Sequence, residues 1–128
     1  MADVAGRTLV EGHATGAALV LQEPISLWGG LDPTTGAIVE ANHPQVGASV
    51  TGRILVMPAG RGSSSSATVL AEAIRLDTGP AGIVLGEIDD IVAIGALVAA
   101  ELYGKTIPVV VVDRATYGAI RDDEEIEL

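Results

Sequence analysis

The pattern of hydrophobic and polar residues in the first half of the chain is typical of short β-strands. Short apolar or β-branched runs are separated by glycine, proline and aspartate, which favour turns. We expect strands at residues 7–11, 15–21, 37–40 and 48–51. The glycine-rich stretch 26–36 contains Asp-Pro and Thr-Gly pairs, so it is interpreted as turns.

The second half of the chain alternates continuous apolar runs with longer segments of helical periodicity. The apolar runs at 54–58, 82–85 and 107–112 predict strands that are covered on both faces. Helices are expected at 67–76, where apolar residues form one stripe, and at about 91–102.

Aspartates at the expected helix starts support these boundaries. Asp89 or Asp90 can cap the second helix, and Asp113 can cap a short segment at 115–121, before a final strand at 125–128. The resulting β-α-β-α-β alternation predicts parallel strands joined by right-handed crossovers. We therefore expect an α/β fold with a β-rich N-terminal half, in a single domain over residues 1–128.

Composition narrows the classes of function. The chain has 17 Asp and Glu against 7 Lys and Arg, a formal net charge of −10 and 2% aromatic residues, so nucleic-acid binding is not expected. It has no cysteine, which excludes disulfides and thiolate-bound metal sites built from this chain alone. No apolar run approaches the ~20 residues of a membrane helix, and the N-terminus lacks the order of a signal peptide. We expect a cytoplasmic protein that binds no membrane.

The main candidate site is the glycine–serine loop, residues 60–66, between a predicted strand and a predicted helix. Its members are Gly60, Arg61, Gly62, Ser63, Ser64, Ser65 and Ser66. A glycine turn that delivers hydroxyls to the first turn of a helix forms an anion site, because unpaired N–H groups and the helix dipole point there. One serine capping the helix is the simpler alternative, but four consecutive hydroxyls exceed what capping needs.

The glycine–serine loop does not match the common nucleotide-binding or hydrolase motifs. It lacks the Gly-Lys-Ser/Thr of a Walker A motif, and Ser65 stands where a dinucleotide fingerprint needs its third glycine or alanine. It is not a Gly-x-Ser-x-Gly nucleophile elbow either. Arg61 could clamp a carboxylate or phosphate, or it could be an exposed loop arginine.

The only tryptophan, Trp28, precedes the glycine pair Gly29 and Gly30. A glycine-rich loop of this kind could be a lid or could face a partner. We interpret Trp28 as a residue that fills a gap in the core, and the two glycines as part of an interface.

A further group of candidates is titratable, namely His13, His43, Glu87, Asp89 and Asp90. Ser-His-Asp catalysis would need one histidine beside Ser63, whereas solitary histidines near turns usually have no catalytic role. The three acids could form a metal or acid–base cluster. A helix cap followed by a solvated turn is the structural alternative that we favour.

Three sequence blocks carry a resemblance to a known family. They are Pro24-x-Ser26-x-Trp28-Gly29-Gly30-x-Asp32-Pro33-x-Thr35-Gly36, Gly47-x-Ser49-x-x-Gly52-Arg53-Ile54-Leu55-Val56 and Pro58-Ala59-Gly60-Arg61-Gly62-Ser63. On these blocks the chain resembles the small subunit, or swivel domain, of the aconitase X family. The loop is also similar to the Gly-x-Gly-Ser-Ser-Arg-Glu loop of aconitases and isopropylmalate isomerases, but Ser65 and Ser66 replace the arginine and glutamate. The carboxylate-binding arginine of those enzymes is therefore absent here.

The resemblance implies a swivelling β/β/α domain that docks on a large subunit. It also implies that Ser63 is the catalytic base. We expect the other six residues of the glycine–serine loop to be candidates for substrate contact, and leave open whether Arg61 takes the place of the missing arginine. The large subunit would hold an iron or iron–sulfur centre, and this chain would bind no metal or cofactor. Family members dehydrate small hydroxy acids, with one branch acting on cis-3-hydroxy-L-proline and an archaeal branch on 5-phosphomevalonate.

We therefore expect the small subunit of a hydro-lyase that is inactive without its large subunit. A phosphate would favour more cations than the isolated Arg61, so cis-3-hydroxy-L-proline is the expected substrate. The alternatives are a phosphomevalonate dehydratase small subunit and a non-catalytic module that binds an anion or a protein. Phosphohistidine carriers also use swivelling β/β/α domains, but they need a loop histidine, and His43 lies well upstream.

Overall fold

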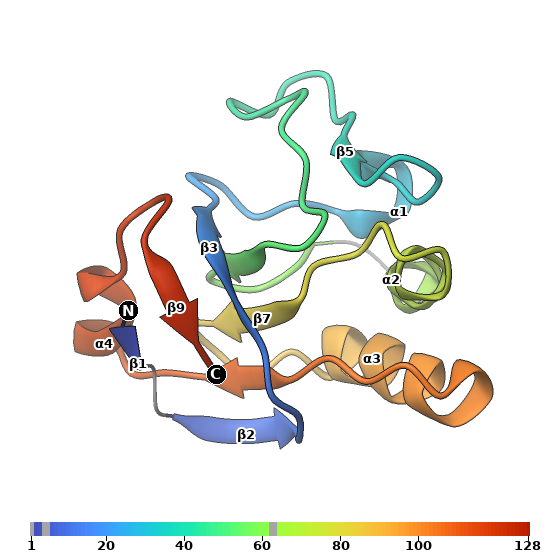
Figure 1. The fold of residues 1–128 in the computed structure, drawn as a ribbon. Coiled ribbons are helices and arrows are strands. Elements are labelled where there is room, and N and C mark those ends of the chain that lie inside the picture. The colour runs from blue at the N-terminus through green and yellow to red at the C-terminus, as the bar shows by residue number, and fades with distance from the viewer. Residues whose placement is uncertain (1, 4–5, 62–63) are drawn as a thin grey trace.

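The apolar runs of the second half form the centre of a seven-stranded sheet that carries helices on both sides (Figure 1). The computed structural model describes residues 2–3, 6–61 and 64–128. In spatial order, the strands of this sheet are β1 (Ala2–Asp3), β9 (Glu125–Glu127), β3 (Thr15–Val20), β6 (Ile54–Met57), β7 (Gly82–Leu85), β8 (Val109–Val111) and β2 (Arg7–Val10). The helices are α1 (Leu27–Gly30), α2 (Ser65–Arg75), α3 (Asp90–Tyr103) and α4 (Arg114–Ala119).

Parallel pairing dominates the middle of the sheet. β6 pairs in parallel with both β3 and β7, and β7 pairs in parallel with β8. All residues of β6 and β7 are buried, as the continuous apolar runs predicted. The alternation of parallel strands with α2 and α3 is confirmed, while β2 and β9 pair antiparallel with their neighbours β8 and β3.

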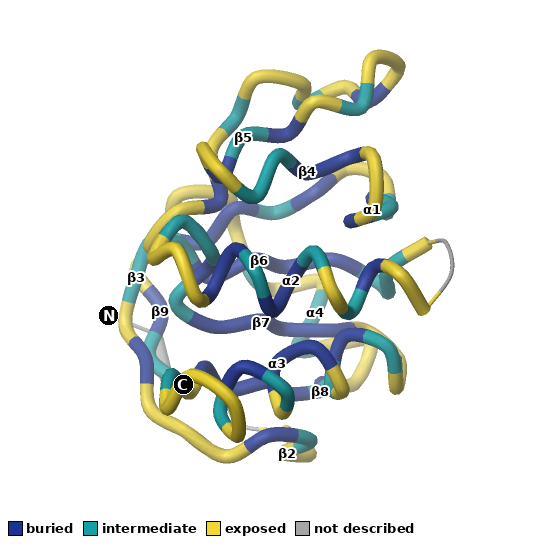
Figure 2. The backbone as a smooth tube through the Cα atoms, turned by 90° about the vertical axis from the view of Figure 1, so that its right-hand side faces the viewer, coloured by how far each residue is buried: buried dark blue, intermediate teal, exposed yellow. Residues whose placement is uncertain are grey.

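Successive residues of each central strand face opposite sides of the sheet, so the core has two parts. On one side, Leu55 and Leu85 pack with Leu70 of α2 and Val92 of α3. On the other, Ile54, Val56, Val84 and Val110 pack with Ile126 of β9 and the half-buried Tyr117 of α4. Figure 2 shows α2 and α3 lying side by side in front of β6 and β7.

The predicted aspartate caps are confirmed. Asp89 precedes α3, and its Oδ1 accepts hydrogen bonds from the backbone N–H groups of Ile91 (3.0 Å) and Val92 (3.2 Å). Asp113 accepts one from Thr116 N–H (2.7 Å) at the start of α4, and this bond lowers the pKa of its carboxyl below the ordinary value.

The stretch 26–36 and the segment after it differ from the expectation. One distorted turn, α1, contains Trp28 and Gly29 with non-helical dihedral angles, and it leads into β4 (Leu31–Asp32), which pairs with β5 (Ala37–Ile38). The strand expected at 48–51 is wrong, because within it only Ser49 forms an isolated bridge, to Ala37. The segment runs beside β5 and forms two further backbone hydrogen bonds there, from Ile38 N–H to the carbonyl of Ala48 and from Val50 N–H to the carbonyl of Gly36, but the pairing is too short to make a strand.

The small β4–β5 sheet is attached to the C-terminal end of α2. Thr78, just beyond α2, donates its hydroxyl to the carbonyl oxygen of Pro33 (2.6 Å), and the Thr51 hydroxyl donates to the carbonyl of Thr78 (2.7 Å). Gly36 has φ +78° and lies so close to Thr51 and Thr78 that a side chain there would collide with both. Glycine is therefore required for this contact. Across the part of the chain that the structure describes, no helix is long and apolar enough to cross a membrane.

Candidate active site at the glycine–serine loop

The glycine–serine loop connects the carboxyl end of β6 to the N-terminus of α2. Ligands of α/β sheets characteristically bind beyond the carboxyl ends of parallel strands, where helix N-termini also point. The predicted base, Ser63, and the predicted substrate contact Gly62 lie outside the described residues. The residues on either side of them show how the loop is held.

Asp89 connects the first residue of the loop to the start of α3. Its Oδ2 accepts a hydrogen bond from Gly60 N–H (2.8 Å), while its Oδ1 caps the helix through Ile91 and Val92. One carboxylate therefore fixes the loop after β6 relative to the helix after β7. The capping role of Asp89 is thus confirmed, and its bond to Gly60 adds a contact that sequence reasoning missed.

Arg61 is held by its backbone and by its side chain. Its N–H donates to the carbonyl of Ile25 (3.0 Å), and its guanidinium forms an ion pair with Glu40 (2.5 Å). The other carboxylate oxygen of Glu40 accepts from Ser26 N–H (3.4 Å). The guanidinium is exposed at the surface yet already has a carboxylate partner, so an anionic ligand would compete with Glu40 for it.

The serines of the loop differ in their surroundings. Ser66 is 3% exposed, and its Oγ accepts a hydrogen bond from Trp28 N–H (3.3 Å), which joins the first turn of α2 to α1. Ser64 and Ser65 are exposed, and Ser64 makes no side-chain capping bond within the described part of the chain. The simple capping explanation therefore does not account for Ser64.

Trp28 lies beside the loop with 63% of its surface exposed, so its interpretation as a core residue is wrong. Its peptide N–H donates to Ser66. The residues of α1 that are buried are Leu27 and Gly30. Gly29 has φ +81° and is exposed, whereas Gly30 is buried, so only the first glycine of the pair is available for the expected interface. The lone tryptophan gave no periodic signal from which its exposure could be read.

The titratable candidates other than Asp89 do not join the loop. His43 is buried, its Nδ1 accepts from Gln45 N–H (3.0 Å) and its Nε2 donates to the carbonyl of Glu23 (2.9 Å), so both ring nitrogens are engaged in structure. His13 lies near Glu127 (3.3 Å) at the surface. Among the described residues, no group of three or more His, Asp or Glu side chains is placed to hold a metal ion.

Space for a ligand beneath the loop is small. A cavity of about 20 Å³ lies between Gly60, Ser66 and Asp89, which is far below the ~300 Å³ or more of typical ligand pockets. Among the described residues, this cavity alone is too small to enclose a small-molecule ligand.

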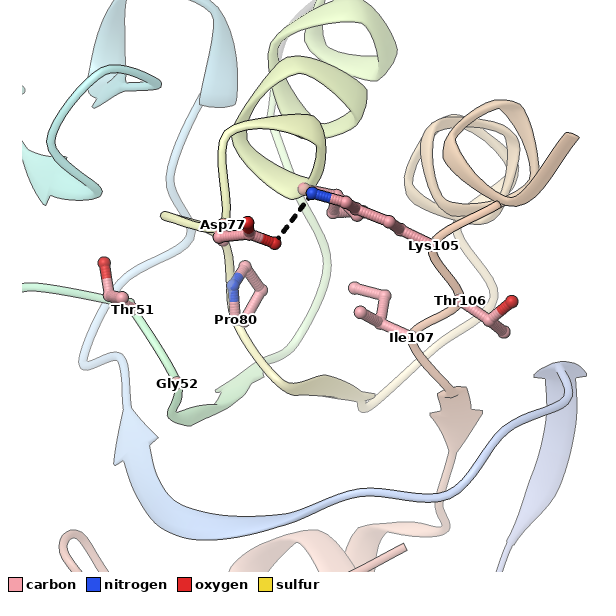
Figure 3. Close-up of a pocket in the computed structure, with 9 residues that line it drawn as sticks. Thr51, Gly52, Asp77, Pro80, Lys105, Thr106 and Ile107 are labelled. Carbon is pink, nitrogen blue, oxygen red and sulfur yellow. Dashed lines mark hydrogen bonds and ion pairs between the residues drawn. The ribbon is translucent and has the colours of Figure 1, made fainter. Parts of the chain in front are cut away.

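A larger hollow of about 430 Å³ lies at the other end of the central strands, away from the glycine–serine loop (Figure 3). Thr51, Asp77, Lys105 and Ile107 line it, near the start of the parallel strands and the end of α2. Lys105 Nζ donates to Asp77 Oδ1 (2.9 Å) and to the carbonyl of Arg75 (2.8 Å). These bonds satisfy the helix end, and the hollow is separate from the glycine–serine loop.

Comparison with known proteins identifies the family of this chain. A family model for the aconitase X swivel domain matches residues 3–128, and the chain belongs to this family. The structure of Thermococcus kodakaraensis aconitase X, holo-form, superposes with a TM-score of 0.83 at 33% identity, covering 95% of this chain and 87% of that one. The expected fold class, a swivelling β/β/α domain, is confirmed.

The named relatives include dehydratases of two kinds. A cis-3-hydroxy-L-proline dehydratase of Pseudomonas aeruginosa is 44% identical over 103 residues, covering 80% of this chain and 18% of that enzyme. A phosphomevalonate dehydratase small subunit of Methanosarcina mazei is 34% identical over 122 residues, covering 94% of this chain and 81% of that subunit. The chain thus spans less than a fifth of the hydroxyproline dehydratases that it matches, at 18% and 19% of their length.

Proposed function

We propose that this chain is the small subunit of a hydro-lyase that removes water from a small hydroxy acid. The observation that carries this proposal is the match of residues 3–128 to the aconitase X swivel domain, with dehydratases of both kinds among the relatives. The position of the glycine–serine loop beyond the ends of the parallel strands, with Arg61, Ser64 and Ser65 exposed, supports a site that a large subunit completes.

In this proposal Ser63 removes a proton next to the substrate carboxylate. A serine hydroxyl is a weak base unless its deprotonated form is stabilised. Ser63 directly precedes Ser64 and α2, so the positive end of the helix dipole would favour the alkoxide. The C–H bond then breaks, its electron pair forms the new double bond, and the C–O bond breaks with its electron pair, so that the departing hydroxide takes up a proton, such as the one gained by Ser63, and leaves as water.

The chain has no cysteine, and its described residues offer no metal-binding cluster. We therefore propose that the iron or iron–sulfur centre implied by the family resemblance belongs to the large subunit. The roles assigned to this chain are substrate orientation by the exposed loop residues and proton removal.

Cis-3-hydroxy-L-proline is the substrate that this site favours. Arg61 is the one cation of the loop, and Glu40 already neutralises it, so the loop offers little charge to a phosphate. The second candidate is 5-phosphomevalonate, supported by archaeal small subunits such as that of Methanosarcina mazei, which this chain matches over 94% of its own length. With that substrate, the large subunit would supply the phosphate-binding cations.

The test is co-expression with an aconitase X-type large subunit from the same genome. The purified complex and the chain alone would be assayed for water loss from both substrates. We expect the complex to dehydrate cis-3-hydroxy-L-proline and the chain alone to be inactive. Turnover of 5-phosphomevalonate would instead select the second candidate. A stable complex inactive on both would keep the subunit role and exclude these two substrates, whereas no complex at all would favour a non-catalytic module that binds an anion or a protein.

A further inference from the structure

The outer face of α3 is apolar where a surface helix is normally polar. Of the residues from Asp90 to Tyr103, only Asp90 near the start and Glu101 near the end are charged. The inner face packs in the core through Val92, Ala96 and Ala99. Ile94 and Leu102, on the outer side, are nevertheless 51% and 69% exposed. A helix that is apolar all round is normally buried all round, so this face is expected to be covered in the working protein.

A groove accompanies this face between α2 and α3. It has a volume of about 670 Å³, and the apolar stripe of α3 that lines it consists of Ile94, Val98 and Leu102, spaced four residues apart. Its α2 side includes Ser64, so the groove begins at the glycine–serine loop. Figure 2 looks onto these two helices.

The groove is nearly free of charge in an otherwise acidic protein. Glu72 is the only charged residue among the described residues that line it. Its two carboxylate oxygens accept from Arg75 (2.6 and 2.8 Å), which lies on the same helix. A partner seated here gains from apolar contact rather than from ion pairs, so its surface must be apolar and uncharged as well.

The proposed function supplies the occupant. In the Pseudomonas aeruginosa enzyme, the matched segment belongs to a much longer chain, most of which lies outside the match. The Methanosarcina mazei relative is named as a small subunit. A partner that receives Ser63 into its active site must contact the loop. The apolar groove starts at Ser64 of that loop and follows α2 through Ala67 and Ala71, so the same partner would reach it.

We propose that the large subunit docks on the outer face of α2 and α3, along the groove that has Ser64 at one end and Leu102 at the other. It would do so through an apolar and uncharged surface of its own. This inference rests on the proposed function. It adds which face of the domain is buried in the complex and by what kind of contact.

The test uses the complex of this chain with its large subunit and two matched charge insertions. Ile94→Asp places a carboxylate in the groove. Val46→Asp places one on a residue with the same 51% exposure, in a turn between β5 and β6 that is not among the residues lining the groove. We expect Ile94→Asp to weaken binding of the large subunit by about tenfold or more, measured by calorimetry, because a desolvated unpaired charge is costly. Val46→Asp should bind like wild type, and both variants should retain the wild-type circular dichroism and melting temperature, since neither side chain is buried.

The outcomes separate the docking face from the proposed function. If the wild-type complex forms and is active but Ile94→Asp binds as tightly as wild type, the docking face is wrong and the function stands. If light scattering shows that the chain alone is a dimer, and that Ile94→Asp makes it monomeric without changing large-subunit binding, the face belongs to a second copy. If wild type forms no complex with the large subunit, the proposed function fails and the docking face fails with it.

Discussion

Asp89 shows how a single side chain can connect helix formation to a functional loop. Its two oxygens serve different elements, since Oδ1 caps α3 and Oδ2 holds the N–H of Gly60. The capping role is visible in the sequence as an aspartate before an apolar periodic run. The bond to Gly60 joins residues 29 positions apart and has no local signature.

We predict that Asp89→Asn separates these two roles. The asparagine oxygen can still cap α3, but its amide nitrogen cannot accept from Gly60 N–H, so the loop loses its anchor. In the active complex, kcat should fall about tenfold with little change in KM or melting temperature, as expected for a positioning residue.

Asp113→Asn is the matched control for Asp89→Asn, because Asp113 caps α4 without contacting the loop among the described residues. It should leave kcat unchanged. Equal kinetic effects of the two variants would show that Asp89 does not position the loop.

Ser63→Ala tests the proposed base directly. Removing the hydroxyl should lower kcat by about 100-fold or more, within the range of general-base contributions, while binding of the large subunit is retained. Steady-state kinetics of the complex measure this. Ser49→Ala, at an exposed serine beside β5, should have wild-type kinetics. Near-normal turnover by Ser63→Ala would refute the assignment.

At the scale of elements, the contact between α2 and α3 depends on Gly95. A Cβ at this position would lie 2.9 Å from the carbonyl oxygen of Ala67 and 3.1 Å from the Cβ of Leu70. The two helices therefore approach each other too closely for any larger residue without a shift of backbone.

We predict that Gly95→Ala lowers the free energy of unfolding by about 1–3 kcal/mol, because overpacking outweighs the gain in helix propensity. Urea unfolding followed by circular dichroism measures it. Gly118→Ala is the control, since Gly118 lies within α4 and no described atom comes within 4 Å of an added Cβ. That variant should be neutral or more stable by about 0.5–1 kcal/mol. If Gly95→Ala left the free energy of unfolding unchanged, the two helices would be able to move apart without losing stability, and the prediction would be wrong.

For the whole molecule, several carboxyls favour the folded state in their charged form. Hydrogen bonds from Thr34, Arg75 and Thr116 lower the pKa of Asp32, Glu72 and Asp113, respectively. A group whose pKa is lowered on folding stabilises the protein above its unfolded pKa, and this contribution is lost as the pH falls through the folded pKa.

We therefore predict that Asp113→Asn reduces the loss of stability on acidification. Melting temperatures of wild type and variant, measured from pH 7 down to about pH 3, should converge at the acidic end, below the ordinary carboxyl pKa. The same net-charge change accompanies any Asp→Asn variant, so Asp90→Asn serves as the control for charge alone. A constant offset between Asp113→Asn and wild type across the whole range would contradict the prediction.

The elements of the second half could be predicted because their signals are local and strong. β7 begins and ends at the predicted residues, and α2, α3 and β6 lie within one or two residues of their predicted limits. The first half was less predictable, because β4 and β5 have only two residues each and the bridge at Ser49 is isolated, so these short pairings leave no clear alternating pattern in the sequence. Trp28 was misplaced because a single aromatic residue carries no periodicity that separates core from surface.

The sequence by itself determined the parallel α/β core, the aspartate caps and the position of the glycine–serine loop between β6 and α2, because each rests on periodicity or on interactions within a few residues. Tertiary structure alone decided that Arg61 is paired with Glu40, that Asp89 holds Gly60, that Trp28 is exposed, and that the apolar outer side of α3 faces a groove. Those features join segments 21 to 38 residues apart or depend on which face of a helix the core leaves uncovered. Such relations arise from the packing of the whole chain, so no local pattern records them.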